Sequence, residues 1–170
     1  MKKIITLLLL LFCIAFSCER DDLCPEDTPT TPKMYVEFRN NLIPENPRNV
    51  SSLRVEDVND AERVLEDFNG VNKNHMILPL KTDAVETQFR VYKDSNILAN
   101  GTNSGNNDII KITYSTEEIY VSRACGYKTI FKNVSITIEN DANNWMLIAT
   151  PENNNQTVIN EDDIHYTIRY

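Results

Sequence analysis

The side chains best suited to covalent chemistry in this sequence are four thiols, at Cys13, Cys18, Cys24 and Cys125. A thiol can be alkylated, oxidised to a disulfide or used as a metal ligand. Cys13 lies inside an apolar run, Cys18 follows that run directly, and Cys24 comes six residues later in an acidic stretch. The positions of these cysteines therefore predict different fates for them.

The N-terminus has the parts of a signal peptide. Lys2 and Lys3 form a basic start, and an apolar run from Ile4 to Phe16 follows, interrupted only by Thr6. The run is shorter than the ~20 residues that a membrane-spanning helix needs. We therefore assign residues 1–17 to a signal peptide, which would remove Cys13, rather than to a buried helix of a cytosolic protein.

Cys18 is predicted to carry a lipid. Small residues, Ala15 and Ser17, stand three positions and one position before it. This spacing resembles the bacterial lipobox, in which a peptidase requires small side chains there and the cysteine thiol receives a diacylglycerol. A leucine is usual where Ala15 stands, and secretion followed by release is the alternative. Acyl chains contribute roughly 0.8 kcal/mol per buried methylene, so two or three chains anchor a protein durably.

Cys24 and Cys125 remain in an exported chain, where disulfides are favoured. We predict a Cys24–Cys125 bridge that closes a loop of about 100 residues and stabilises the fold by roughly 4–5 kcal/mol. Two free thiols and an intermolecular bridge remain open alternatives. An activated thiol at Cys125, beside Arg123, is a further reading that we favour less.

Residues 18–33 are predicted to form an extended tether, because they contain Pro25, Pro29 and Pro32 and few aliphatic residues. Unbridged, about 15 residues at ~3.1 Å each span ~45 Å, whereas a bridge at Cys24 shortens the tether to ~20 Å. The acidic residues after Cys18 resemble the export signal of Bacteroidota surface lipoproteins, although Arg20 interrupts them. These acidic residues are Glu19, Asp21 and Asp22. A solvated linker is the alternative.

Other reactive side chains do not form a recognisable motif. His75 and His165 are far apart at the edges of predicted strands, and we interpret both as solvated or capping side chains. The carboxylate pairs Glu117-Glu118 and Asp162-Asp163 are interpreted as a solvated face. The sequence contains no nucleophile elbow, Gly-rich phosphate loop or HExxH motif. We therefore assign no catalytic residue, no metal site and no cofactor.

Two segments could bind a small ligand. Residues 100–108, with the sequence NGTNSGNND, are rich in side-chain oxygens, as calcium loops are, but contain a single carboxylate. We favour a mobile loop there and leave calcium binding open. Trp145 could stack on a sugar ring if it were exposed. Its apolar neighbours Met146, Leu147 and Ile148 favour a core position.

From Met34 onward, apolar and polar residues alternate in short segments, as in half-buried strands. The alternation covers residues 34–38, 53–55, 89–91, 110–114, 119–123, 134–138 and 166–170, and an apolar run covers 145–149. Residues 34–170 are therefore predicted to form one all-β domain, a two-sheet β-sandwich of immunoglobulin-like type, with a small barrel as the alternative.

One stretch has a helical pattern. Asn59 and Glu62 stand in capping-box relation, and Gly70 would end a helix whose face holds Val64, Leu65 and Phe68. We expect a short helical turn there.

Three motifs resemble those of a family of small lipoproteins from Flavobacteria and relatives, known as a domain of unknown function. They are CERDDLCPEDTPTTP (18–32), LPLKTD (78–83) and VSRACGYKTIFKNV (121–134). The resemblance implies a lipoprotein of a Gram-negative envelope and implies no catalytic residues. Cys24 and Cys125 both lie inside these motifs, which supports their pairing.

The formal charge of −8 and the pI of about 4.8 argue against nucleic acid and against charge-driven binding to anionic lipid. We therefore expect an outer-membrane lipoprotein, on the periplasmic or the cell-surface face, that acts as a binding or accessory module. Its expected partners are the membrane, through the N-terminal anchor, and an envelope protein or a glycan. The alternatives are a hydrolase that uses paired carboxylates and an inhibitor that blocks a lytic enzyme through residues 100–108.

Overall fold

The computed structural model describes residues 23–170, except for the side chains of residues 61 and 62. Within this range the chain forms nine β-strands. They are β1 (Met34–Arg39), β2 (Val50–Asp57), β3 (Asp60–Lys73), β4 (His75–Leu78), β5 (Glu86–Lys93), β6 (Asn106–Ser122), β7 (Gly126–Ile138), β8 (Ile148–Pro151) and β9 (Tyr166–Arg169). In the part of the chain that is described, no helix has the length and apolar character needed to cross a membrane.

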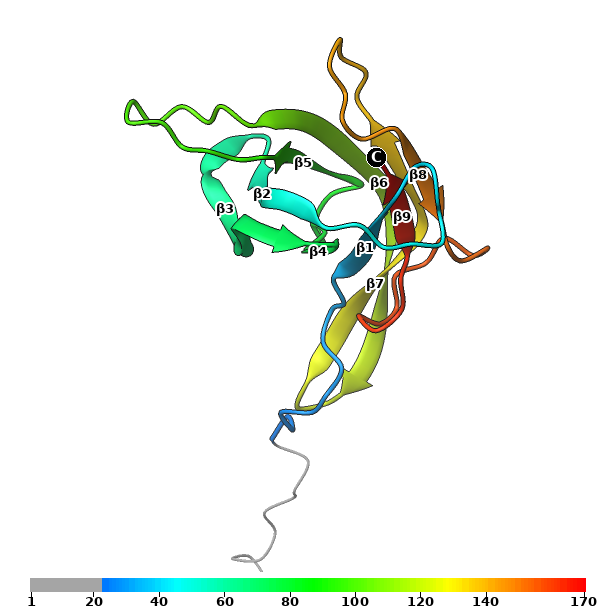
Figure 1. The fold of residues 1–170 in the computed structure, drawn as a ribbon. Helices are drawn as coiled ribbons and strands as arrows, with labels where there is room; N and C mark the ends of the chain where they lie inside the picture. Colours follow the sequence, from blue (N-terminus) through cyan, green and yellow to red (C-terminus); the bar gives the residue numbers. More distant parts are fainter. Residues whose placement is uncertain (1–22) are drawn as a thin grey trace, which may run out of the picture.

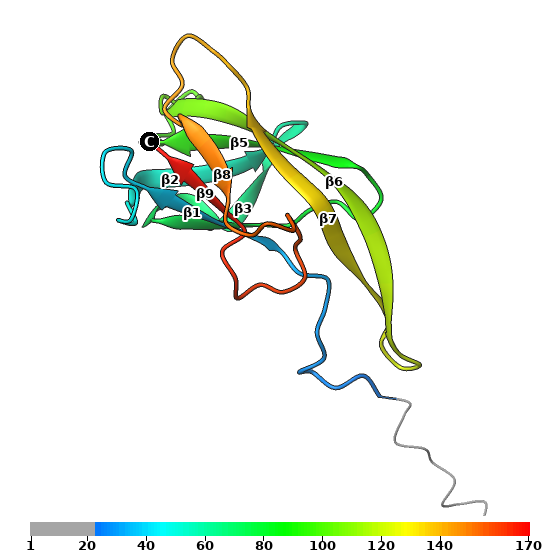
Figure 2. The same ribbon diagram turned by 90° about the vertical axis from the view of Figure 1, so that its right-hand side faces the viewer.

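The strands form two sheets that pack face to face (Figures 1 and 2). One sheet has the order β4-β1-β9-β8, and the other has the order β3-β2-β5-β6-β7. All pairs are antiparallel except β1 and β9, which run parallel. The predicted all-β, two-sheet sandwich is confirmed, while its immunoglobulin-like type stays a prediction.

The core lies between the sheets, where the alternating pattern directs every second side chain. Met34, Val36 and Phe38 of β1 are fully buried, and so are Ile110 and Ile112 of β6. Burying apolar side chains contributes roughly 1.5–3 kcal/mol each, which makes this interface the main stabilising element.

Trp145 belongs to this core. Its ring packs against Phe38 at a centroid distance of 5.7 Å and against Tyr170 at 5.3 Å. Its indole N–H donates a hydrogen bond to the carbonyl of Val91 at 3.2 Å. The predicted core position of Trp145 is therefore confirmed, and its ring is not available to stack on a sugar.

The helical turn predicted at residues 59–70 is wrong, because residues 60–70 belong to strand β3. Asp57 and Asp60 pair across a tight turn, in which the backbone N–H of Asn59 donates to Asp57 Oδ1 at 2.9 Å. Asn59 is therefore a turn residue and not a helix cap. Gly70 has a φ of +75° within the strand, at a place where the pairing with β2 is irregular. Pairing with β2 thus outweighs a weak local helix preference.

The predicted segments 110–114 and 119–123 lie on one continuous strand, β6, except for Arg123, which falls in the turn after it. Strand β6 forms a long hairpin with β7. The first half of β6 also pairs with β5, and this pairing ends at Thr113. Beyond Ser115 the hairpin projects from the sandwich toward the N-terminal segment (Figures 1 and 2). A two-stranded hairpin is only marginally stable by itself, so this projection needs additional support.

Candidate functional site

The predicted lipidation site, Cys18, lies outside the described residues. Cys24 and Cys125 are described, and a disulfide bond joins them, with their Cα atoms 4.9 Å apart. Cys125 lies in the turn between β6 and β7, so the bond attaches the N-terminal segment to the tip of the hairpin. This attachment provides the support that the projecting hairpin needs.

Residues 24–33 continue along the body after the disulfide. The backbone N–H of Thr129 on β7 donates to Thr31 Oγ1 at 3.0 Å. The backbone N–H of Lys33 donates to Glu161 Oε1 at 2.9 Å. Within the predicted tether 18–33, the part from Cys24 onward is therefore bound to the domain.

Residues 24–33 and the segment around Val158 together cover an edge of one sheet. β7 is the edge strand of its sheet. Thr31 covers part of that edge, and Phe131 exchanges two backbone hydrogen bonds with Val158, at 2.8 and 3.1 Å. Covering the edge of a long strand removes a template for aggregation.

The body contains an open cleft of about 460 Å³ next to the turn between β2 and β3. One wall is the connection from β4 to β5, and we call the space the 79–83 cleft after the residues of that wall. Its apolar lining includes Leu65 and Phe89. Its charged lining consists of Asp57, Arg63, Lys81 and Asp83.

A closed ring of hydrogen bonds holds the wall of the cleft in place. The backbone N–H of Lys81 donates to Thr87 Oγ1 at 3.0 Å. The hydroxyls of Thr87 and Tyr114 are 2.6 Å apart, and the Tyr114 hydroxyl donates to the carbonyl of Lys81 at 2.8 Å. Burial raises the pKa of Tyr114, which keeps its hydroxyl protonated as this ring requires. Lys81 is thus fixed through its backbone at the cleft wall.

The comparison with protein families finds a match over most of the domain. A model described as "Family of unknown function (DUF6452)" matches residues 52–170. The chain belongs to the DUF6452 family. No curated protein and no solved structure matches this chain. The matched range of this DUF6452 domain includes the 79–83 cleft and Cys125, but it begins after Cys24 and β1.

Sequence reasoning missed the cleft of the DUF6452 domain. The LPLKTD motif at residues 78–83 carried the signal, because it supplies the apolar Leu80 and the charged Lys81 and Asp83. Asp57 and Arg63 complete the charged lining of the cleft. They come from the β2–β3 hairpin, where the sequence pattern wrongly predicted a helical turn. Charges of both signs above an apolar floor can bind a peptide or a glycan through ion pairs and hydrogen bonds.

The two histidines flank Tyr35. The ring of His75 stacks on the ring of Tyr35 at a centroid distance of 5.1 Å. His165 is buried, and its Nδ1 accepts a hydrogen bond from the backbone N–H of Tyr35 at 2.9 Å. Burial lowers the pKa of both histidines, so they are neutral near pH 7. Both contacts stabilise the fold. The solvated position predicted as one option for these histidines is wrong for His165, which is buried, and His75 is partly exposed.

The predicted carboxylate pairs do not line the cleft. Glu117 forms an ion pair with Lys132 on the hairpin. Asp162 and Asp163 lie in a loop before β9, where their backbone N–H groups both donate to Asn160 Oδ1 at 3.0 Å. Among residues 23–170, no group of three or more His, Cys, Asp and Glu side chains is arranged to hold a metal ion.

The oxygen-rich segment 100–108 is organised by its own asparagines. Asn103 Oδ1 accepts hydrogen bonds from the backbone N–H groups of Asn96 and Gly105, both at 3.0 Å. The one carboxylate of the segment, Asp108, is fully buried and contacts the backbone at Trp145 and Met146. That carboxylate is therefore occupied by hydrogen bonds inside the domain and does not face the loop.

Proposed function

We propose that this DUF6452 protein is a lipoprotein of a Gram-negative outer membrane, anchored through Cys18, that acts by binding a partner. The signal peptide pattern and the resemblance to a lipobox support the anchor. One structural observation carries the proposal furthest, namely that the Cys24–Cys125 disulfide attaches the chain to its domain six residues after Cys18. A domain held this close to its anchor is suited to a stationary partner in the same envelope.

The 79–83 cleft is the proposed binding site, and the proposed ligand is a segment of an envelope protein or a glycan. The cleft combines Arg63 and Lys81 with Asp83 above apolar side chains. This mixture suits a ligand with polar groups along an extended backbone. The acidic residues that follow Cys18 support a position on the cell surface.

The test is co-purification of the tagged, full-length protein from cross-linked envelopes, followed by mass spectrometry. Lys81→Glu should reduce recovery of the partner. Lys132→Glu makes the same charge change on the hairpin, where it removes only a partly exposed ion pair, and it should retain the partner. If no protein is recovered, a glycan array with the same two variants tests the second ligand class. Failure of both assays would contradict the proposed binding function.

The anchor has a separate test. The variant Cys18→Ala should move from the membrane fraction to the soluble fraction, and the mass of the wild-type N-terminal peptide should include a diacylglycerol. Wild-type protein that is soluble and carries no lipid would contradict the anchor, whatever the binding assays show.

Inhibition of a lytic enzyme is a second candidate function, because the connection between β5 and β6 protrudes from the domain (Figure 1). Internal hydrogen bonds from Asn100 and Asn103 order this connection, as an inhibitory loop requires. Addition of the purified protein to a peptidoglycan lysis assay tests the idea. Replacing Asn103 with Ala should weaken any inhibition, because it removes the internal acceptor.

A further inference from the structure

Apolar and aromatic side chains are exposed at the tip of the β6–β7 hairpin and on the N-terminal segment that is bonded to it. Leu23 is 82% exposed, Tyr120 is 55% exposed and Tyr127 is 66% exposed. We call these three residues the tip patch. Leu23 and Tyr120 line one hollow at the tip, and Tyr127 lines a second hollow with Cys24 and Cys125. The tip patch therefore surrounds the disulfide.

Stability of the hairpin explains only part of this arrangement. Tyr120 and Tyr127 are paired across the two strands, and their rings meet edge to face at a centroid distance of 5.4 Å. Such a cross-strand pair contributes about 0.2–1 kcal/mol. More than half of each side chain nevertheless remains exposed, and Leu23 is more exposed than either. This apolar surface is available to a partner.

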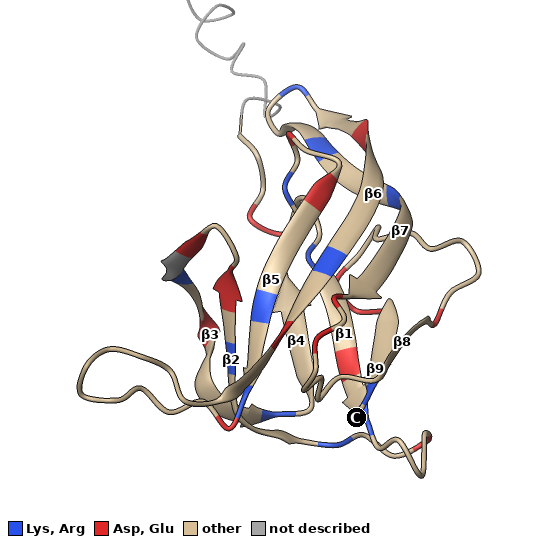
Figure 3. Ribbon diagram, turned by 90° about the horizontal axis from the view of Figure 1, so that it is seen from above, with Lys and Arg blue, Asp and Glu red and all other residues tan. Residues whose placement is uncertain are grey.

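Charged residues of both signs surround the tip patch. Arg123, Lys128 and Glu26 line the two hollows, and Asp27 lies at the same end of the molecule. The whole chain has a net charge of −8. Figure 3 shows acidic and basic residues on β5 and β6, and basic residues on β7. The segment between Cys18 and Leu23 adds Glu19, Asp21 and Asp22 against the single Arg20. Insertion of the tip patch into a bilayer would therefore rely on its apolar side chains and not on attraction to an anionic surface.

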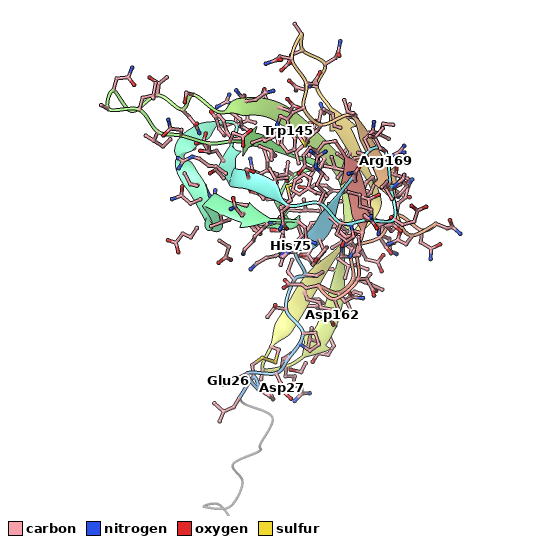
Figure 4. All side chains as sticks on the ribbon, in the orientation of Figure 1. Glu26, Asp27, His75, Trp145, Asp162 and Arg169 are labelled. Atoms are coloured by element: carbon pink, nitrogen blue, oxygen red, sulfur yellow. A yellow bond between two sulfur atoms is a disulfide. The ribbon has the colours of Figure 1, made fainter. Side chains whose placement is uncertain are left out.

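The position of the tip patch identifies the partner. Leu23 is the residue next to the disulfide-bonded Cys24, and Cys18 is only five residues before Leu23. A fully extended segment of this length spans less than ~20 Å. Figure 4 shows Glu26 and Asp27 at the tip, at the opposite end of the molecule from Trp145. A lipid on Cys18 would therefore keep the tip beside the bilayer.

We propose that the tip patch inserts into the interface of the bilayer that holds the Cys18 anchor. This inference rests on the proposed lipidation. Tyrosine suits the interface because its ring is apolar and its hydroxyl reaches water. The bilayer contact and the disulfide together make the hairpin a strut, since the roughly eight residues from Ser115 to Ser122 span about 25 Å. The strut holds the sandwich and its cleft away from the lipid.

The test uses the lipidated, full-length protein in vesicles of phosphatidylethanolamine and phosphatidylglycerol with brominated acyl chains, which quench tryptophan on contact. The variant Tyr120→Trp places a probe in the tip patch. Leu42→Trp is the matched control, because Leu42 is 88% exposed in the connection after β1. The buried Trp145 is common to both proteins and reports that each is folded.

The probe at position 120 should lose about half of its emission and shift to shorter wavelength, as expected for a side chain about 5–10 Å into the interface. The probe at position 42 should keep its emission. In a Tyr120→Trp background, replacing Cys24 and Cys125 with Ser should reduce the quenching, because the tip is then no longer held at the anchor.

An unquenched probe at position 120, in protein that carries lipid and floats with the vesicles, would overturn the strut and leave the anchor intact. Protein that carries no lipid by mass spectrometry would overturn the anchor and the strut together. A shift of the probe's emission to shorter wavelength that occurs only after an envelope protein is added would indicate a protein partner in place of the bilayer. That result would overturn the inference.

Discussion

The carboxylate of Asp108 accepts hydrogen bonds from the backbone N–H groups of two consecutive residues, Trp145 at 3.0 Å and Met146 at 2.7 Å. Asp108 lies on β6 and is fully buried, and the two N–H groups belong to the segment that leads into β8. The contact therefore joins the two sheets at the place where Trp145 enters the core. In the sequence Asp108 resembled a possible calcium ligand of the segment 100–108, but in the structure it accepts backbone hydrogen bonds that stabilise the fold.

Removal of this acceptor should destabilise the domain strongly. Asp108→Ala leaves two buried N–H groups without a partner, and we expect a loss of about 2–4 kcal/mol in the free energy of unfolding. Asp108→Asn keeps one oxygen as an acceptor and should cost about 1 kcal/mol. Urea unfolding at pH 7 measures both values. Equal stability of the Ala and Asn variants would contradict the structural role.

The stability difference between the wild type and Asp108→Asn should depend on pH. Burial raises the pKa of Asp108, and the two backbone hydrogen bonds only partly offset this effect. The folded chain therefore keeps a proton at pH values where the unfolded chain has lost it. The stability from this group is greatest below the unfolded pKa of ~3.9 and is lost as the pH rises through the folded pKa. Asp108→Asn should accordingly be more damaging at pH 4 than at pH 7.

The histidines should make the domain sensitive to mild acid. Burial lowers the pKa of His165, although Asp163 acts in the opposite direction, so the unfolded chain binds more protons just below pH 6.5. The stability from His165 is complete above the unfolded pKa and is lost as the pH falls toward the folded pKa. Protonation of Nδ1 would also break its hydrogen bond with Tyr35.

His165→Asn tests this expectation, because the Asn side-chain oxygen can replace Nδ1 as the acceptor. The loss in unfolding free energy between pH 7.5 and pH 5 should be smaller in His165→Asn than in the wild type. His75→Asn should have a similar but separate effect, since burial also lowers the pKa of His75. An unchanged pH dependence in the double variant would rule out both histidines as its source.

Reduction of the disulfide should destabilise the domain by about 4–5 kcal/mol, since Cys24 and Cys125 are separated by 101 residues. Urea unfolding with and without a reductant measures the loss. A variant with Ser at both positions should be insensitive to the reductant and should match the reduced wild type. Limited proteolysis should cut residues 24–33 faster in this variant, because the start of the segment is released while the hydrogen bonds of Thr31 and Lys33 hold its C-terminal end.

Tyr170 should be essential for folding. It is buried, its hydroxyl donates to the carbonyl of Asn49 at 2.7 Å, and its carbonyl accepts from Arg48 Nη1 at 2.9 Å. We expect Tyr170→Phe to cost about 1 kcal/mol through the lost hydrogen bond. Tyr170→Ala should cost about 3–5 kcal/mol through the cavity next to Phe38 and Trp145. Thermal unfolding of the two variants separates these contributions, and a similar melting temperature for both would show that the ring is not required.

Local pattern was sufficient to predict much of the fold. Strands β1, β7 and β9 follow from strict alternation at Val36, Ile136 and Ile168, because a half-buried strand requires a period of two. The same reasoning failed at β3. There a capping pattern at Asn59 and Glu62 imitates a helix, and only pairing with β2 distinguishes the turn from the cap. The cleft at Lys81 was missed because its walls come from three strands and one loop that are separated in sequence.

The sequence by itself determined the alternation that indicates half-buried strands. It also determined which two cysteines remain after the predicted signal peptide and lipid site are assigned. Both are properties of residue order and need no coordinates. The tertiary structure alone decided that Asp108 faces inward, that Arg63 and Lys81 share a cleft, and that Leu23 lies beside Tyr120. These relations depend on how distant segments pack, and packing is set by the sum of many weak contacts that no local pattern records.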